Sequence, residues 1–422
     1  MVKRIDAQEA VQETWLTSPL GEPIALDWSH DGDEWQRHLT RLITKRTGST
    51  GFSAKGLQAI HGLPGLAFSL NGAQLHSELW SVPLEKGMLL LVSGVGLQPA
   101  DDQIQPWIDA AKAALEDVGA GRALQPWAAV IGSMPGGVAH SPGKTLEGDV
   151  HIAGLHISPA GHQLEEGRPP SHPSMGQTNV YVSYPIVVRG SSPGYDWWST
   201  SREAFAQLHR LCALMSVAMD ECWVVREGPW PDAGTDVRVP DRIGLPALPE
   251  GGARETPTLV KPPDWMDAGI VRAMADPRFA RRLAGFQEGM EAQYEHPSLA
   301  AIAFVAVVES VGAQLFPLRR CKECGSQVGS GKAFRQALRL ALPENEAQLL
   351  DATYGVRSKT AHEGQLHGSE PTFGMTTGPS FWGPNPAFAF EWQQLWMLRK
   401  AARVLIERDL SGTLPPPGRR TP

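Results

Sequence analysis

An arginine and a histidine near the C-terminus are the residues of this chain best suited to shared chemistry. They lie in YGVRSKTAHEG, residues 354–364, where His362 follows Arg357 by five positions. A guanidinium grips a phosphate with its planar fork, and an imidazole exchanges protons near neutral pH. Five positions on an ideal helix are about 140° apart, so both side chains could line one broad groove. Ser358 lies four residues before His362, on the same helix face, and could orient its ring.

The charge around this pair differs from that of the whole chain. The 422 residues carry a net charge of −7, which gives no general attraction to nucleic acid or anionic membranes. Between residues 319 and 359, basic residues outnumber acidic ones by eight to four; they are Arg319, Arg320, Lys322, Lys332, Arg335, Arg339, Arg357 and Lys359. This excess is typical of a local phosphate-binding surface. The residues alone leave a plainer alternative open, a helix end that carries two polar side chains.

Helices are the elements expected to position this pair. Apolar residues at helical spacing predict a helix over 265–291 that breaks at Pro277, and further helices over 297–316, 330–342, 343–364 and 387–410. Pro297 and Pro343 stand where a first helical turn accepts proline. Helices of these lengths with modest connections predict a four-helix bundle.

This pattern resembles the HEPN domain (higher eukaryotes and prokaryotes nucleotide-binding). The wording of residues 354–364 looks especially like its Apea-like branch, which carries a tyrosine, then Arg-Ser, then a histidine and a glycine. The resemblance covers about residues 290–410 and implies a metal-independent endoribonuclease that works as a homodimer, with Arg357 and His362 as catalytic residues. Supporting positions are Ser358, Glu363, Tyr354 and, in the helix over 297–316, Glu309; RNA is expected to contact Lys359, Arg335, Arg339 and Lys332.

The implied reaction gives a physical reason for a dimer. Cleavage of RNA through its own 2′-OH needs a base, an acid, and a cation beside the phosphorane. One motif supplies one histidine, and a twofold axis would supply the second. The resemblance also implies a bacterial toxin or antiphage effector that its first domain restrains until a trigger, still unknown, arrives. Because some HEPN domains only dimerise or bind nucleotide or RNA, a non-catalytic module is the alternative.

The rest of the chain predicts an α+β multidomain protein. Residues 1–227 indicate a mixed α/β sensing or binding domain, 228–263 a proline-rich linker, 264–412 the helical domain, and 413–422 a disordered tail. Within the first domain we expect strands over 88–95, 126–134 and 179–188, a two-residue hairpin turn at Asn71-Gly72, and helices over 101–121 and 199–223. Thr200 and Glu203 are spaced for a capping box at the start of the second helix.

Three smaller patterns have competing interpretations. Cys321 and Cys324 form one C-x-x-C followed by Gly325, like one knuckle of a zinc ribbon, and this half-site could be completed by a histidine or by the same pair of a second subunit. A redox pair and an ordinary reduced loop are the alternatives, so a structural zinc ion is the one cofactor left open. Cys212 and Cys222 are ten residues apart on a predicted helix, which is poor geometry for completing that site. The nearby GSQVGSGK lacks the spacing of a phosphate loop, which excludes an NTPase.

Aromatic and histidine clusters occur in the first domain. Trp197 and Trp198, with Tyr195, could stack bases or staple a loop to a core, and stapling is the commoner role. His151 and His156 flank a predicted bulge at Ala153-Gly154, and with His162 they are better explained as exposed strand histidines than as a metal site. The absence of a secretory signal and of an apolar run of about 18 residues predicts a cytoplasmic protein without membrane contact.

Overall fold

The computed structural model describes residues 14–17, 32–49, 51–60, 63–71, 77–83, 88–95, 101–134, 143–168, 179–234, 242–243, 256–293, 296–316, 319–320, 327–351, 353 and 386–416. The chain is a mixed α/β protein whose contacts divide it into two compact units. Unit 1 comprises Met1–Leu124 and Pro193–Thr200, and unit 2 comprises Gln125–Ser192 and Ser201–Pro422. Residues of the predicted first domain, 1–227, therefore belong to both units.

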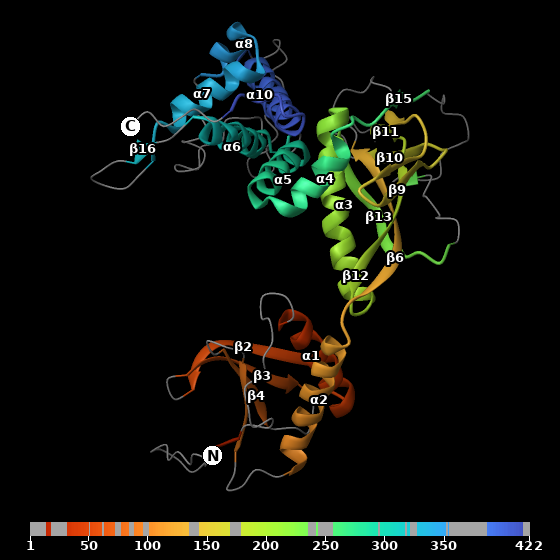
Figure 1. The fold of residues 1–422 in the computed structure, drawn as a ribbon, viewed down its shortest axis with the longest axis vertical. Coiled ribbons are helices and arrows are strands. Elements are labelled where there is room, and N and C mark those ends of the chain that lie inside the picture. Colours follow the sequence, from red (N-terminus) through yellow and green to blue (C-terminus); the bar gives the residue numbers. More distant parts are fainter. Residues whose placement is uncertain are drawn as a thin grey trace. The chain divides into compact units, whose positions relative to one another are not determined.

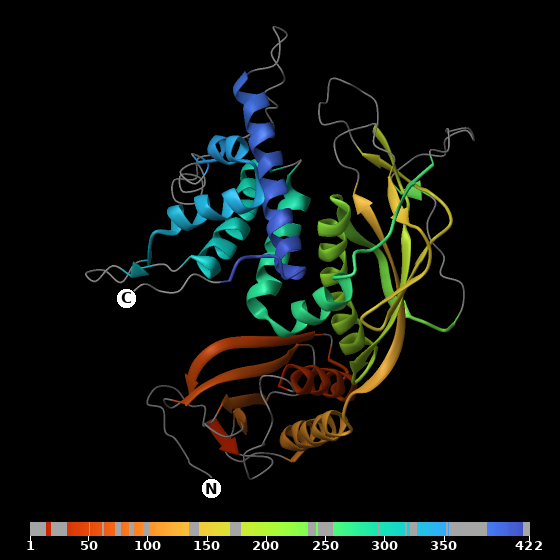
Figure 2. The same ribbon diagram turned by 45° about the horizontal axis from the view of Figure 1, so that its top comes forward.

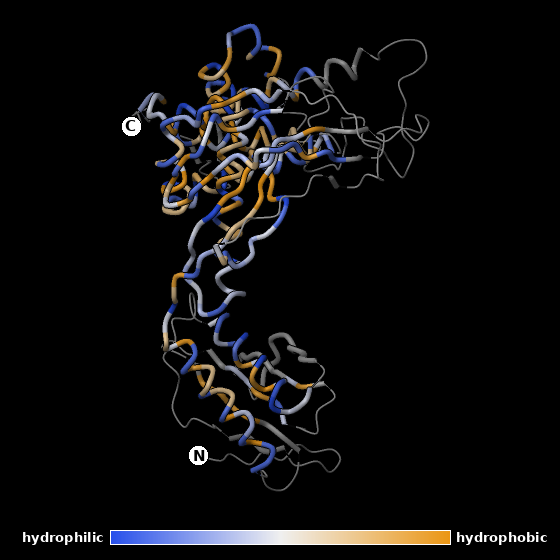
Figure 3. The backbone as a smooth tube through the Cα atoms, turned by 90° about the vertical axis from the view of Figure 1, so that its right-hand side faces the viewer, coloured by the Kyte–Doolittle hydropathy of each residue, from blue (hydrophilic) through white to orange (hydrophobic). Residues whose placement is uncertain are grey.

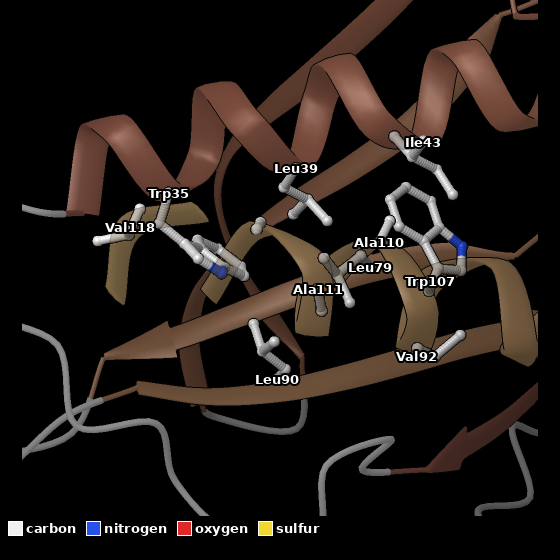
Figure 4. Packing of buried hydrophobic residues seen from close by; sticks show 11 residues of the cluster. Trp35, Leu39, Ile43, Leu79, Leu90, Val92, Trp107, Ala110, Ala111 and Val118 are labelled. Carbon is white, nitrogen blue, oxygen red and sulfur yellow. The ribbon is translucent and has the colours of Figure 1, made fainter. Parts of the chain in front are cut away.

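Unit 1 is an antiparallel sheet covered by two helices. Its elements are β1 (Thr14–Thr17), α1 (Gly32–Thr47), β2 (Gly51–Ile60), β3 (Leu63–Asn71), β4 (Glu78–Pro83), β5 (Met88–Val95) and α2 (Asp101–Gly119). The strand order is β1-β5-β4-β3-β2. Trp35 and Leu39 of α1, Trp107 of α2, and Leu79 and Leu90 of the strands meet in one buried core (Figure 4). Both helices alternate hydrophilic and hydrophobic residues along their length, as helices with one buried face do (Figure 3).

The predicted strand over 88–95 and the predicted helix after it are confirmed, but the turn at Asn71-Gly72 is wrong. Strands β3 and β4 do form an antiparallel hairpin, in which Phe68 lies opposite Leu79. A two-residue turn at Asn71-Gly72 would have required Leu70 to face Ala73. Asn71 instead pairs with Gly51 of β2. Pairing with β2 therefore keeps β3 extended up to the position of the expected turn.

Unit 2 contains the second five-stranded sheet, with strand order β13-β6-β12-β9-β8. Its strands are β6 (Ala123–Met134), β8 (Val150–Ile152), β9 (Leu155–Pro159), β12 (Ile186–Gly194) and β13 (Cys222–Pro231). Smaller sheets join β11 (Asn179–Ser183), β10 (Leu164–Arg168) and β14 (Arg242–Ile243), and β15 (Thr258–Val260) with β7 (Lys144–Leu146). The described parts of the predicted linker thus include strands, since β14 and β15 pair in parallel with β10 and β7.

Helix α3 (Trp197–Met219) begins earlier than its predicted capping box. The capping residue is Asp196, whose Oδ1 accepts the backbone N–H of Ser199 at 3.1 Å. The hydroxyl of Ser199 in turn accepts the backbone N–H of Asp196 at 3.2 Å, so the reciprocal pair is Asp196 and Ser199 rather than Thr200 and Glu203. Further along, α3 lies between the sheet of unit 2 and helices α4 (Met266–Ala275) and α5 (Pro277–Ala292) (Figures 1 and 2).

The C-terminal part of unit 2 is a helical assembly, and most of its predicted helices are confirmed. It consists of α4, α5, α6 (Pro297–Leu315), α7 (Ser330–Ala341), α8 (Glu344–Leu349) and α10 (Pro386–Leu410), with the short strands β16 (Arg319–Arg320) and β17 (Gln327–Val328). The predicted break at Pro277 is present, because Asp276 ends α4 and caps α5 through the backbone N–H groups of Arg278 and Phe279. Helix α10 packs against α5, α6 and α7, and α6 packs against α5 and α7.

Helix α6 is long and apolar enough to meet the criterion for a membrane span, although no such segment was expected from the sequence. It has 19 residues and, within the described part of the chain, is the one helix long and apolar enough to cross a membrane. Half of its most apolar window is buried inside the fold, and the Phe304 ring lies 5.8 Å from that of Phe286 on α5. This packing is what the core helix of a helical assembly shows.

Candidate functional site

The residues that the motif predicts as catalytic lie outside the described part of the chain. Arg357 and His362, with Tyr354, Ser358, Lys359 and Glu363, belong to the segment between α8 and α10. The geometry of this candidate site is therefore built from the elements at both ends of the segment and from Glu309, Lys332, Arg335 and Arg339, which are described.

The predicted helix over 343–364 is interrupted after Leu349, and Arg357 and His362 lie outside the described residues. Helix α8 stops at Leu349, and a tight turn follows in which the N–H of Leu350 donates to the carbonyl of Ala347 and that of Asp351 to the carbonyl of Gln348, both at 3.1 Å. Leu350 is fully buried. Burial of this leucine offsets the loss of regular helix, a tertiary effect that periodicity does not reveal.

Helix α8, which leads into the segment, is held to two neighbouring helices. Arg339 of α7 reaches Glu344 with its Nε at 3.1 Å and Asp351 with its Nη2 at 3.4 Å. Lys400 of α10 reaches Glu346 of α8 at 2.9 Å. Hydrogen bonds from Gln348 and from Arg339 lower the pKa of Glu344, which keeps the carboxylate charged. The chain therefore enters the segment from a helix fixed by ion pairs.

The four described site residues differ in availability. Lys332 and Arg335 are exposed on α7, and within the described residues neither of them forms an ion pair. Arg339 is engaged by two carboxylates and is less free for a phosphate. Glu309 is half-buried on α6, one turn before Gly312, where α6 and α7 approach each other closely.

The two pairs of cysteines have different surroundings. Cys321 and Cys324 lie outside the described residues, in the connection between β16 and β17, which pair antiparallel. Cys212 and Cys222 are buried free thiols, and Cys222 begins β13 rather than continuing a helix, which corrects that prediction. In the described part of the chain no three His, Cys, Asp or Glu residues form a group that could hold a metal ion.

His151 and His156 form a cross-strand pair rather than flanking a bulge. They lie directly opposite each other in β8 and β9, with ring centroids 4.8 Å apart. Ala153 and Gly154 make the two-residue turn with φ of 49° and 81°, the geometry of a tight hairpin. Asp149 lies 3.4 Å from Nε2 of His156.

The aromatic cluster of unit 1 pairs with arginines. Trp198 is 52% exposed, and the guanidinium of Arg37 lies 4.8 Å from its ring centroid. Arg122 lies 5.5 Å from the ring of Tyr195. Arg37 is itself fixed by Glu34 and Asp196, each at 2.8 Å. The Trp198 and Tyr195 rings thus each have an arginine of the same unit near their face.

One cavity of unit 2 could not be predicted from the sequence. It lies between α3, β13 and α5, and its lining residues come from segments that helical and strand periodicity treat separately. The buried side of each element was predictable, whereas a gap between three elements was not.

Comparison with known proteins assigns no family, because no family model, no curated protein and no solved structure matches the chain.

Proposed function

We propose that this protein is a metal-independent endoribonuclease of the HEPN type, with Arg357 and His362 at a site shared by two copies of the chain. The observation that carries the proposal is that the described helices on either side of the motif, α8 and α10, belong to one helical assembly. The motif lies in the chain between α8 and α10, and α8 is tied to α7 and α10 by ion pairs.

The packing of that assembly supports the same proposal. Its helices surround α6, and α6 and α7 come so close at Gly312 that an added Cβ would lie 2.5 Å from the carbonyl oxygen of Ala333. Exposed Lys332 and Arg335 on α7 add positive charge next to the helix that leads to the motif. Such charge attracts an RNA backbone whatever its sequence.

The proposed reaction transfers the scissile phosphoryl group within the RNA. His362 of one copy removes the 2′-OH proton as the 2′-oxygen attacks phosphorus, and the bond to the 5′-oxygen breaks. The second copy's histidine protonates the departing 5′-oxygen, which leaves a 2′,3′-cyclic phosphate and a 5′-hydroxyl. Arg357 neutralises the charge that develops on the phosphorane oxygens. A cytoplasmic toxin or antiphage role, regulated through residues 1–227, is the biological setting that we propose.

The test is cleavage of end-labelled RNA by the purified chain in excess EDTA. We expect the wild type to leave 2′,3′-cyclic phosphate ends, and His362→Ala and Arg357→Ala to lose at least about 100-fold in rate, as removal of a general acid–base group does. His367→Ala is the matched control, a histidine of the same segment outside the motif. Equal rates for the wild type and His362→Ala would refute the catalytic assignment. If neither the wild type nor any variant cleaves RNA but all of them bind it, the non-catalytic module would be favoured.

A further inference from the structure

Unit 2 contains a cavity of about 320 Å³, at the lower end of the roughly 300–1,000 Å³ range of small-ligand sites. Helix α3 contributes Phe205, His209 and Cys212 to its lining, and α5 contributes Gln287 and Glu291. The rest of the lining is the run from Trp223 to Gly228 of β13. All of the lining residues belong to unit 2, so the cavity is a property of one compact unit.

The irregular course of β13 accounts for the space. This strand is at the edge of its sheet, and its pairing with β6 shifts between Val225 and Glu227 and again between Glu227 and Trp230. Gly228 has a φ of +85°, and an added Cβ would lie 2.7 Å from the Trp230 ring, so only glycine fits there. Bulges of this kind commonly bend an edge strand next to a functional site.

The walls combine aromatic rings with neutral polar groups. Trp223 is fully buried, and its indole N–H has no hydrogen-bond partner within the described residues. Phe205 is 39% exposed, and its ring stacks on His209 with centroids 6.3 Å apart and planes 28° apart. Burial, followed by the proximity of Cys222 and Glu291, raises the pKa of the Cys212 thiol, which therefore stays protonated.

The charged side chains that line the cavity leave it with an excess of negative charge. Arg226 is neutralised by Glu166, at 2.9 Å with both side chains largely buried, and it also donates to the carbonyl of Ser133 at 2.6 Å. Glu227 and Glu291 form no ion pair within the described part of the chain. Glu291 accepts one hydrogen bond from the Gln287 amide at 2.8 Å, and that amide also donates to the Trp223 carbonyl. Two carboxylates thus remain as the charged groups free to meet a ligand.

We propose that this cavity binds a small organic cation, an ammonium or guanidinium group on a flat apolar body. A carboxylate pairs with such a group through charge-assisted hydrogen bonds, and an aromatic face attracts the same cation. The apolar body would lie against the exposed Phe205 ring. A phosphorylated ligand is disfavoured, because the one arginine of the lining is already paired. The inference concerns a second site and does not depend on the proposed ribonuclease function.

Calorimetric titration of the full chain with three probes of similar shape and different charge tests the proposal. The probes are phenethylamine, neutral 2-phenylethanol and anionic phenylacetate. We expect phenethylamine to bind with a dissociation constant on the order of 1 mM or lower, as a compact ligand of this size can. The alcohol should bind at least about tenfold more weakly, and the anion should not bind.

Variants separate the cavity from the rest of the surface. Glu227→Gln and Glu291→Gln should each weaken phenethylamine binding about tenfold, in line with the loss of a charge-assisted contact. Glu288→Gln, on the same helix but exposed and outside the lining, should leave it unchanged. Equal binding of amine and alcohol, no binding of the amine, or insensitivity to both cavity substitutions would overturn the proposal. If one glutamine variant fails to fold, the other still decides the matter.

Discussion

At the scale of single residues, Asp196 shows how one carboxylate serves two purposes. It caps α3 through the N–H of Ser199, and it forms an ion pair with Arg37 at 2.8 Å. Burial by itself raises its pKa, but the hydrogen bonds from Arg37 and from the Ser199 backbone outweigh burial and lower it. The charged form is therefore favoured in the folded state more than in the unfolded state.

Substitutions at this position separate the cap from the charge. Asp196→Asn keeps an acceptor for the cap and loses the charge, whereas Asp196→Ala loses both and should cost about 1 kcal/mol more in unfolding free energy. Folding lowers the pKa of Asp196, so its charged form stabilises the folded state above the unfolded pKa of about 3.9. This contribution to the unfolding free energy is lost as the pH falls through the lower pKa of the folded state. Urea unfolding at pH 7 should show the wild type above Asp196→Asn, and the gap should close toward pH 2. A gap of the same size at both pH values would contradict this explanation.

At the scale of elements, two helical glycines face very different neighbours. A Cβ on Gly312 of α6 would lie 2.5 Å from a backbone carbonyl of α7, which cannot move without displacing that helix. A Cβ on Gly285 of α5 would meet nothing closer than a Val307 methyl at 3.4 Å, an ordinary contact. The close approach of α6 and α7 thus depends on one position.

Alanine at these positions should have opposite effects. Gly312→Ala is expected to lower the unfolding free energy by about 1–3 kcal/mol, the usual cost of overpacking a well-packed contact. Gly285→Ala should be neutral or raise it by up to about 1 kcal/mol, because alanine favours the helix. Denaturant unfolding of both variants measures the difference. Equal effects would mean that α7 can shift at little cost.

The same elements show what the sequence predicts well. Apolar spacing and prolines at first turns located α5, α6, α7 and α10 closely, because these signals are local. The early end of α8, the long β3–β4 connection and the strands β14 and β15 were missed. Strands β14 and β15 pair with β10 and β7, which lie far back in the chain, whereas β3 is extended by its neighbour β2 and Leu350 is buried by tertiary packing.

At the scale of the whole molecule, the two candidate sites stand in opposite relations to the sequence. The motif with Arg357 and His362 is contiguous and therefore visible in the sequence, and in the proposed mechanism it acts together with a second copy of the chain. The cavity with Phe205, Glu227 and Glu291 is assembled from three elements and is invisible to any local pattern. Its recognition required knowing which charges are already paired, which is a property of the folded unit.

A shared active site has a consequence that one chain alone does not have. If each site needs a histidine from both copies, a mixed dimer of the wild type and His362→Ala contains too few histidines to cleave RNA. Adding a tenfold excess of His362→Ala to a fixed amount of wild type should therefore reduce cleavage about tenfold once subunits have exchanged, because most wild-type chains then sit in mixed dimers. The same excess of His367→Ala should not reduce it, and cleavage by wild type alone should rise more steeply than linearly with concentration near the dimer dissociation constant. If the rate stays constant on addition of His362→Ala, each chain acts alone, and the twofold mechanism must be abandoned even where His362 is essential.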